Sequence, residues 1–193
     1  METTHRTTPE ETRERILAAA REVYVRNGPL GATTREIAQL AGVNEVTLFR
    51  HFGSKDRLFS EMVERCCSLT QITDFDEESG DVRQDLIRIG LSFARRMERV
   101  EDLIRVNMSA KSLNGESPIL KGPMRFHALL TEYLRRQIDA GRIAGDADRL
   151  TRALTGMIFS HVMGKRFWNQ DHPTTEQDIA FYTDIFLKGT LQS

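Results

Sequence analysis

The chain of 193 residues carries 27 Lys+Arg against 28 Asp+Glu, a formal net charge of −1, and residues 1–57 are themselves close to neutral. This balance argues against a protein that coats nucleic acid through a broad basic face, because such binding is driven by the release of counterions from the phosphate backbone. No apolar run approaches the roughly 18 residues that a membrane span needs, and the polar start METTHRTTPEE has no signal-peptide core, so we expect a cytoplasmic protein.

Helical spacing of apolar residues dominates the chain and strand-like alternation is scarce, which predicts an all-α protein of about nine helices. Thr8 can cap a first helix with proline at its first position, and Gly28-Pro29 marks its end. The apolar stripe of this helix includes Ile16 and Val23, and it would pack against the next two helices to complete a three-helix unit.

Residues 33–52, TTREIAQLAGVNEVTLFRHF, predict two short helices joined by a tight turn. Thr33 and Glu36 can form a capping box at the start of the first helix, and Gly42 suits the left-handed conformation that ends it. Asn44 can cap the second helix, whose inward face contains Leu48 and Phe52. Its outward side chains are Glu45, Val46, Thr47, Phe49 and Arg50. Because a helix-turn-helix places such residues in the major groove, DNA binding is the leading hypothesis.

The segments that follow give weaker signals. Ser54 can cap a fourth helix. The acidic stretch at 74–81 lacks the spacing of an EF-hand, so we expect a solvated loop and no metal site. Cys66 and Cys67 are adjacent on a predicted helix and cannot form a relaxed disulfide with each other, which leaves packing cysteines or reactive thiols. Further helices are expected at 81–100, at 101–113, from Pro118 or Pro123 to near Gly141, and from Asp146 or Asp148 onward.

Residues 153–164, ALTGMIFSHVMG, contain no charged residue and are apolar or small around the whole helix. Such a helix is buried on every side. Small residues spaced four apart let another helix approach closely, so we expect a homodimer in which this helix and the last one form a four-helix bundle. A central core helix in a monomer is the alternative. The candidate interface residues are Gly156, Ser160, Gly164, Phe167, Ile179, Tyr182 and Phe186.

The block TTREIAQLAGVNEVTLFRHFGSKDRLF resembles the signature of the tetracycline-repressor (TetR) family of bacterial transcriptional regulators. The resemblance covers about Pro9 to Val63, and the rest of the chain matches only in layout. It implies a DNA-binding domain at 8–63 and a larger helical domain for ligand binding and dimerisation at 64–193.

The resemblance also implies which residues meet DNA. Thr33, Arg35, Thr47, His51 and Lys55 would contact mainly phosphates, and Glu45, Val46, Thr47 and Arg50 would meet base edges. The implied set is completed by Thr34 and Phe49. The family often has tyrosine in place of Phe49, so this chain lacks that hydroxyl and the residue would contribute by packing.

The resulting expectation is a homodimeric repressor that a small, largely apolar effector releases from a near-palindromic DNA operator. Candidate effector-binding residues are Phe93, Met97, Met108, Phe126, Leu130, Tyr133, Met157 and His161. A transcriptional activator, a ligand-independent regulator and a non-specific architectural DNA-binding protein are the alternatives. Because the chain has no metal-ligand spacing, phosphate loop or nucleophile elbow, we expect no enzyme and no cofactor.

Overall fold

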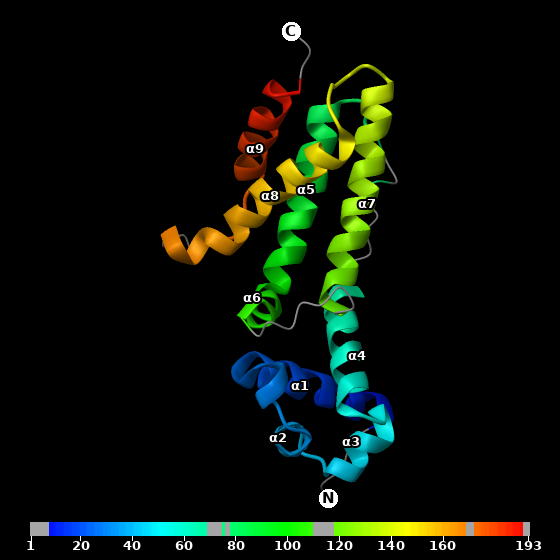
Figure 1. The fold of residues 1–193 in the computed structure, drawn as a ribbon. Coiled ribbons are helices and arrows are strands. Elements are labelled where there is room, and N and C mark those ends of the chain that lie inside the picture. The colour runs from blue at the N-terminus through cyan, green and yellow to red at the C-terminus, as the bar shows by residue number, and fades with distance from the viewer. Residues whose placement is uncertain (1–7, 69–74, 76–77, 110–117, 169–171, 191–193) are drawn as a thin grey trace, which may run out of the picture. The chain divides into compact units, whose positions relative to one another are not determined.

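The computed structural model describes residues 8–68, 75, 78–109, 118–168 and 172–190, and within these ranges it contains helices and no strand (Figure 1). The all-α expectation is confirmed. The α-helices are α1 (Pro9–Gly31), α2 (Thr34–Leu40), α3 (Glu45–Phe52), α4 (Lys55–Ser68), α5 (Val82–Arg99), α6 (Glu101–Ser109), α7 (Pro118–Asp139), α8 (Ala147–Gly164) and α9 (Glu176–Lys188), with a 3-10 turn η1 (Lys165–Trp168) after α8.

The helices form two compact units. The N-terminal unit contains α1 to α4 together with α6, and the C-terminal unit contains α5, α7, α8, η1 and α9. The assignment of α6 to the N-terminal unit departs from a single boundary between residues 63 and 64. The functional division of the chain at that boundary stays a prediction.

Local signals start the helices of the N-terminal unit. Thr8 and Glu11 form a complete capping box on α1. Gly28, at φ 73°, interrupts the helix where the sequence predicted its end, and a short helical segment then continues to Gly31. Asn44 caps α3, where its side chain accepts a hydrogen bond from the amide of Thr47 at 2.7 Å. The capping box expected at α2 is only half formed: Thr33 accepts from the Glu36 amide at 3.2 Å.

The other half of that capping box is lost to a tertiary contact. The Glu36 carboxylate pairs with Arg26 and accepts a hydrogen bond from Asn27 at 2.7 Å. Both partners belong to the last turns of α1. A charged partner outcompetes a backbone amide for a carboxylate, since hydrogen bonds between ionised groups are the stronger kind. The Glu36 side chain therefore connects α2 to α1 and does not cap its own helix.

The core of the N-terminal unit forms where α1 contacts α2 and α4 and where α3 contacts both α2 and α4. Its most deeply buried side chains include Ile16, Ala20, Val23, Ile37, Leu48, Leu58 and Met62. Helix α6 adds Leu103 to this core and is held to α1 by polar contacts. The Tyr24 hydroxyl donates to Asn107 Oδ1 at 3.0 Å, and Arg21 binds both carboxylate oxygens of Asp102 at 3.0 and 3.1 Å.

In the C-terminal unit, α5 lies between α7 and the α8–α9 pair (Figure 1). Gly90 lets α5 approach closely, because a methyl group there would lie 2.8 Å from Ile179 Cγ2 and 3.1 Å from Ile158 Cδ1. Phe93 of α5 also stacks on Phe126 of α7 with ring centroids 4.5 Å apart. Helix α5 therefore packs against α7 as well as against the α8–α9 pair.

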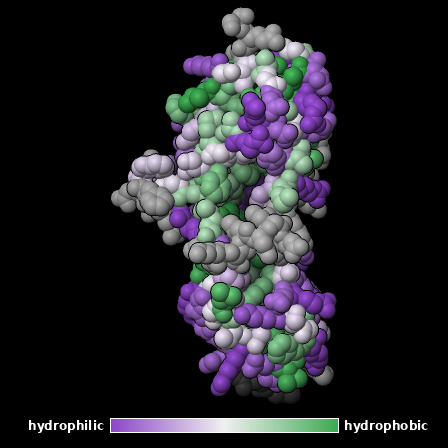
Figure 2. Space-filling view, viewed as in Figure 1, coloured by the Kyte–Doolittle hydropathy of each residue, from purple (hydrophilic) through white to green (hydrophobic). Residues whose placement is uncertain are grey.

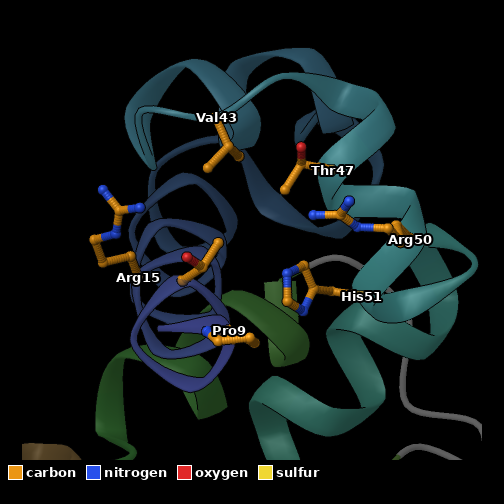
Figure 3. A pocket seen from close by; sticks show the side chains of 7 residues that line it. Pro9, Arg15, Val43, Thr47, Arg50 and His51 are labelled. Atoms are coloured by element: carbon orange, nitrogen blue, oxygen red, sulfur yellow. The ribbon is translucent and has the colours of Figure 1, made fainter. Parts of the chain in front are cut away.

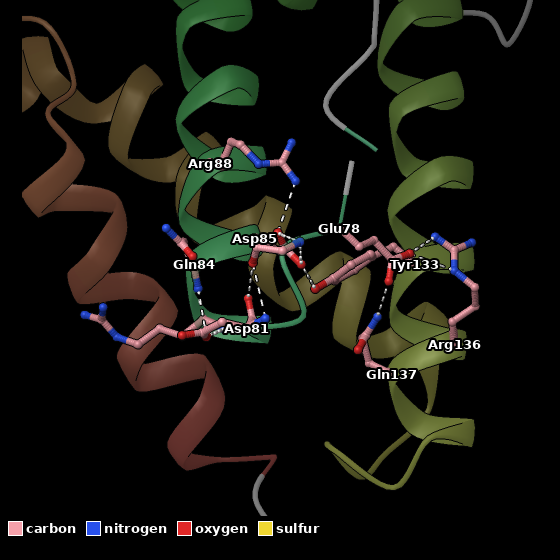
Figure 4. Close-up of polar contacts among 10 residues, drawn as sticks. Glu78, Asp81, Gln84, Asp85, Arg88, Tyr133, Arg136 and Gln137 are labelled. Atoms are coloured by element: carbon pink, nitrogen blue, oxygen red, sulfur yellow. Dashed lines mark hydrogen bonds and ion pairs between the residues drawn. The ribbon is translucent and has the colours of Figure 1, made fainter. Parts of the chain in front are cut away.

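A buried carboxylate joins α5 to α7 (Figure 4). Asp85 is 2% exposed and accepts hydrogen bonds from the Ser79 amide at 3.0 Å, from Arg88 at 3.2 Å and from the Tyr133 hydroxyl at 3.3 Å. Burial alone would raise the pKa of Asp85, but these hydrogen bonds favour the ionised form and hold its pKa below the usual value. This hydrogen-bonded cluster therefore holds α5 and α7 together inside the unit.

Candidate nucleic-acid interface

Helix α3 is anchored on one face and open on the other. Leu48 and Phe52 are buried, whereas Val46 is 77% exposed and Phe49 is 43% exposed. Arg50 is exposed as well. Figure 2 shows hydrophobic side chains gathered over α3, with hydrophilic ones beside them. This is the arrangement expected from the sequence, and it leaves apolar groups available for contact with thymine methyl groups.

Glu45 and Thr47, the other two side chains expected to point outward, are half-buried. Thr34 at the start of α2 donates to Glu45 Oε2 at 2.8 Å. Thr34 and Glu45 therefore fix the first turns of α2 and α3 relative to each other. Sequence reasoning assigned both residues to DNA contact, and the structure adds this internal bond.

The end of α3 is held by an arginine that sequence reasoning did not single out. Arg13 of α1 donates to the backbone carbonyl of His51 at 3.1 Å and forms an ion pair with Glu61 of α4, in which Nε lies 2.8 Å from Oε1. Its guanidinium carbon also lies 4.5 Å from the centroid of the Phe52 ring. One side chain thereby joins α1, α3 and α4.

The cations of the N-terminal unit fall into two groups. Four arginines form ion pairs within the unit: Arg13 with Glu61, Arg21 with Asp102, Arg26 with Glu22 and Glu36, and Arg65 with Glu14. Among the residues that the structure describes, five other cations of α1 to α4 have no acidic partner: Arg15, Arg35, Arg50, Lys55 and Arg57. Cations that are not neutralised internally are those available to phosphates.

Of these five cations, the sequence singled out Arg35, Arg50 and Lys55, and it missed Arg15 and Arg57. Nothing in the local pattern separates Arg15 from Arg13, because both lie on a helix rich in charges. Only the tertiary contacts show which one is already paired.

A pocket with a volume of about 560 Å³ lies between α1 and α3 (Figure 3). Its lining residues are Pro9, Thr12 and Arg15 of α1, Val43 of the turn, and Thr47, Arg50 and His51 of α3. Three of the side chains that sequence reasoning placed at DNA thus converge on one concave surface. The contribution of α1 was not expected.

The candidate effector residues are distributed over both units. Five of them are buried in the C-terminal unit: Phe93, Met97, Phe126, Leu130 and Tyr133. Met108 is 54% exposed and lies on α6 in the N-terminal unit, whereas the other seven candidates lie in the C-terminal unit. The sequence grouped it by chemistry alone, because helical spacing carries no information on which unit a helix joins.

The remaining two candidates, Met157 and His161, lie on α8. The His161 side chain is 8% exposed, its Nδ1 lies 3.2 Å from the Tyr182 hydroxyl, and its Nε2 is buried without a hydrogen-bond partner among the described residues. Burial lowers the pKa of His161, and Asp178, whose Oδ2 lies 3.9 Å from Nε2, opposes this only in part. The ring is therefore held in its neutral form next to α9, with one of its two nitrogens, Nε2, left without a hydrogen bond.

The candidate dimer residues are divided between surface and core. Gly156 and Ser160 are exposed, Tyr182 is half-buried, and Ile179 and Phe186 are buried inside the unit. Trp168 covers Gly164, so a methyl group there would collide with its ring. The side chain of Phe167 lies outside the described part of the chain. Ile179, Phe186 and Gly164 therefore face the interior, which corrects the interface drawn from the sequence.

Three other features can be assessed in the described ranges: a metal site, a membrane-spanning helix and a reactive cysteine. No group of three or more His, Cys, Asp or Glu side chains there is placed to hold a metal ion. None of the helices in those ranges combines the length and hydropathy required to cross a bilayer. Cys66 is half-buried, and burial raises the pKa of its thiol, which disfavours the reactive thiolate.

Comparisons with known proteins identify relatives of this chain. Residues 16–62 match the family model of bacterial regulatory proteins, tetR family. The chain is similar to the HTH-type transcriptional regulator YvkB of Bacillus subtilis, with 27% identity over 186 residues that cover 92% of this chain and 96% of YvkB. It is also similar to the nucleoid occlusion factor SlmA of Marinobacter nauticus, with 30% identity over 182 residues that cover 88% of this chain and 91% of SlmA.

A solved structure shares the fold. The TetR family transcriptional regulator PfmR from Thermus thermophilus superposes with a TM-score of 0.69 at 24% identity, and the match covers 90% of this chain and 97% of PfmR. At this level of identity the likeness concerns the fold.

Proposed function

Because the chain belongs to the tetR family of bacterial regulatory proteins, we propose that it is a homodimeric repressor that a small molecule releases from a near-palindromic operator. The family consists of DNA-binding regulators of transcription and not of enzymes, which confirms two expectations drawn from the sequence. The dimer, the operator and the effector are the parts that we propose.

The observation that supports operator binding is the division of charge in the N-terminal unit. The cations left without an internal acidic partner include Arg35 and Arg50 of the helix-turn-helix and Lys55 at the start of α4. Beside them, Val46 and Phe49 present apolar surface on α3. Unpaired cations hold phosphates in register, while the exposed face of α3 meets the base edges. Thr33, Thr34, Thr47 and His51 complete the proposed contact set.

The dimer is supported by the surface of α8 and α9. Phe181 is 62% exposed and Ile185 is 47% exposed, and they lie four residues apart on α9. On α8, which contacts α9, the exposed residues include Gly156 and Ser160, whose small size permits close helix approach. Burying these surfaces against a second copy would cover large apolar side chains that one chain leaves in water. Tyr182 stays in the proposed interface, at its edge.

The effector is proposed to bind inside the C-terminal unit. The aromatic and methionine side chains of α5 and α7 give adaptable apolar walls, and the buried Nε2 of His161 has an unfilled hydrogen-bonding capacity. A ligand that satisfies this nitrogen would gain a bond that is missing without it. To release the operator, the ligand must bind the DNA-free state more tightly than the DNA-bound state.

The test is a selection of binding sequences followed by an affinity measurement. Duplexes enriched from a random pool, together with the intergenic DNA beside the gene, are compared with scrambled duplexes by fluorescence anisotropy at about 0.15 M salt, where a specific regulator prefers its site by ~10³ or more. We expect an enriched sequence with two inverted half-sites. Arg50→Gln should reduce the preference, whereas Arg65→Gln should not, because Arg65 is paired with Glu14.

Two results would overturn the proposal. If no sequence is enriched and all duplexes bind equally with a steep dependence on salt, the protein is an architectural DNA-binding protein. If an enriched duplex binds one chain per site without symmetry, the homodimeric arrangement is wrong.

A further inference from the structure

We infer that the pocket between α1 and α3 holds a phosphate of the DNA backbone and that Arg15 supplies its charge from the α1 side. This α1–α3 pocket is the one lined by Pro9, Thr12, Arg15, Val43, Thr47, Arg50 and His51. The inference rests on the proposed function, since it assigns an additional contact to the same DNA. It extends the footprint beyond the helix-turn-helix to the first helix of the chain.

The chemistry of the pocket fits an anion. Two guanidinium groups, an imidazole and two threonine hydroxyls line it, and none of its seven lining residues is acidic. Arg15 is exposed and has no acidic partner among the described residues, in contrast to Arg13 two positions earlier, which is engaged by Glu61 and the His51 carbonyl. Residues two apart on a helix point in widely different directions, so one α1 can use Arg13 for its core contacts and Arg15 for the pocket.

The position of Arg15 brings its charge to the helix-turn-helix. Its Nη1 lies 3.8 Å from the point where a Cβ on Gly42 would stand, so the guanidinium reaches the turn between α2 and α3. In Figure 3, Arg15 lies on one side of the pocket, with Thr47, Arg50 and His51 of α3 on the other. An anion between them would be bound from both sides.

DNA is the source of phosphate that this geometry favours. One wall of the pocket is α3, whose neighbouring residues Val46 and Phe49 are exposed toward the proposed groove. A helix seated in the major groove has backbone phosphates on both of its flanks, and these are the usual anchors that set its register. Guanidinium groups bind phosphate oxygens in a fork-like geometry, which suits the presence of Arg15 and Arg50 on opposite sides of the pocket.

The experiment combines a charge-removing variant with neutral DNA linkages. Affinities of wild type, Arg15→Gln and the control Arg65→Gln are measured on the selected duplex and on scrambled DNA over a range of salt. Arg15→Gln should weaken both by a similar factor, about tenfold per half-site, and should lower the slope of log K against log salt by about 1.8, as expected when the homodimer loses one phosphate contact in each of its two half-sites. Arg65→Gln should leave the slope unchanged, because Arg65 is paired with Glu14.

Methylphosphonate substitution then identifies the phosphate. Each backbone position of the selected duplex is made neutral in turn. Wild type should lose affinity at one position per half-site where Arg15→Gln loses none, since the two changes remove the same contact. Circular dichroism melting of Arg15→Gln should match that of wild type, because the side chain is exposed.

Two outcomes overturn the inference. If Arg15→Gln keeps the wild-type slope and the wild-type sensitivity at every methylphosphonate position, α1 does not contact the backbone. If inorganic phosphate titrated at constant ionic strength binds wild type but not Arg15→Gln, and Arg15→Gln shows no coupling to any methylphosphonate position, the pocket is a site for free anions. The proposed function is tested separately, by the preference of wild type for the selected over the scrambled duplex. Operator binding and the Arg15 contact can therefore be disproved independently.

Discussion

At the scale of single residues, two arginines of α1, Arg13 and Arg15, have different roles. Arg13 and Arg15 are separated by one residue, yet Arg13 joins α1 to the end of α3 and to α4, while Arg15 stays exposed. The bond from Arg13 to the His51 carbonyl satisfies one of the carbonyl groups that every helix leaves unpaired at its end. Arg13 is thus a structural residue, and Arg15 is free to bind a ligand.

Replacing Arg13 by alanine should therefore reduce the stability of the protein. The change removes a charge-assisted pair, a helix-end hydrogen bond and the contact with the Phe52 ring, so we expect the free energy of unfolding to fall by about 1–3 kcal/mol. Urea unfolding followed by circular dichroism measures it. Arg15→Ala is the matched control and should leave the unfolding midpoint near that of wild type. If the unfolding midpoint of Arg13→Ala equals that of Arg15→Ala, Arg13 is not a structural residue.

At the scale of elements, the buried Asp85 cluster determines how α5 and α7 meet. Asp85 of α5 accepts from Ser79 just before that helix and from Tyr133 on α7. Burial and the neighbouring Asp85 carboxylate raise the pKa of the Tyr133 hydroxyl, which keeps it protonated and able to donate. A satisfied buried network of this kind specifies one packing arrangement, because each partner lost would leave a polar group unpaired.

The cluster predicts a specific dependence on acid. Because the pKa of Asp85 is lowered in the folded state, its ionised form stabilises the protein fully above the unfolded pKa of about 3.9, and this contribution is lost as the pH falls through the folded value. Asp85→Asn should lower the free energy of unfolding by about 1–3 kcal/mol at pH 7. The difference between variant and wild type should shrink below about pH 4.

Thermal melting of both proteins between pH 3 and pH 7 tests this dependence. Asp139→Asn is the control, because it removes the same charge from an exposed position of α7. A difference between wild type and Asp85→Asn that stays constant over the whole pH range would contradict the assignment of a stabilising carboxylate.

At the scale of the whole molecule, the proposed homodimer depends on apolar surface that a single chain leaves exposed. The C-terminal unit uses Ile179 and Phe186 for its own core and leaves Phe181 and Ile185 exposed on α9. Large apolar side chains on a helix that is otherwise well packed mark an interaction surface. Because a dimer links two DNA-reading units, its loss should weaken operator binding far more than it weakens the binding of one half-site.

Replacing Phe181 by glutamate should therefore give a folded monomer. The carboxylate would have to be buried without a partner in the dimer, whereas it remains in water in the monomer. Light scattering after size exclusion measures the mass, and anisotropy should show at least a tenfold loss of affinity for a duplex with two half-sites. Met124→Glu is the control, because Met124 of α7 is equally exposed, at 62%, and lies outside α8 and α9. A Phe181→Glu protein that keeps the dimeric mass would place the interface elsewhere.

The sequence by itself determined the features that depend on neighbouring residues. Thr8 and Asn44 start α1 and α3 as expected, and Gly42 takes a positive φ of 66° in the turn of the helix-turn-helix. Caps and turns are made by side chains and amides within about four residues of each other, so short patterns suffice to predict them. The exposed face of α3 follows from the same periodicity, once Leu48 and Phe52 point inward.

Only the tertiary structure decided which partner each side chain takes. Glu36 pairs with Arg26 instead of completing its capping box, Met108 belongs to the N-terminal unit, and Ile179 and Phe186 pack inside while Phe181 and Ile185 do not. Each of these outcomes depends on contacts between segments far apart in the chain. An apolar or charged residue on a helix shows the same local pattern whether its own chain, a second copy or DNA covers it, because the pattern records the chemistry of a surface and not its partner.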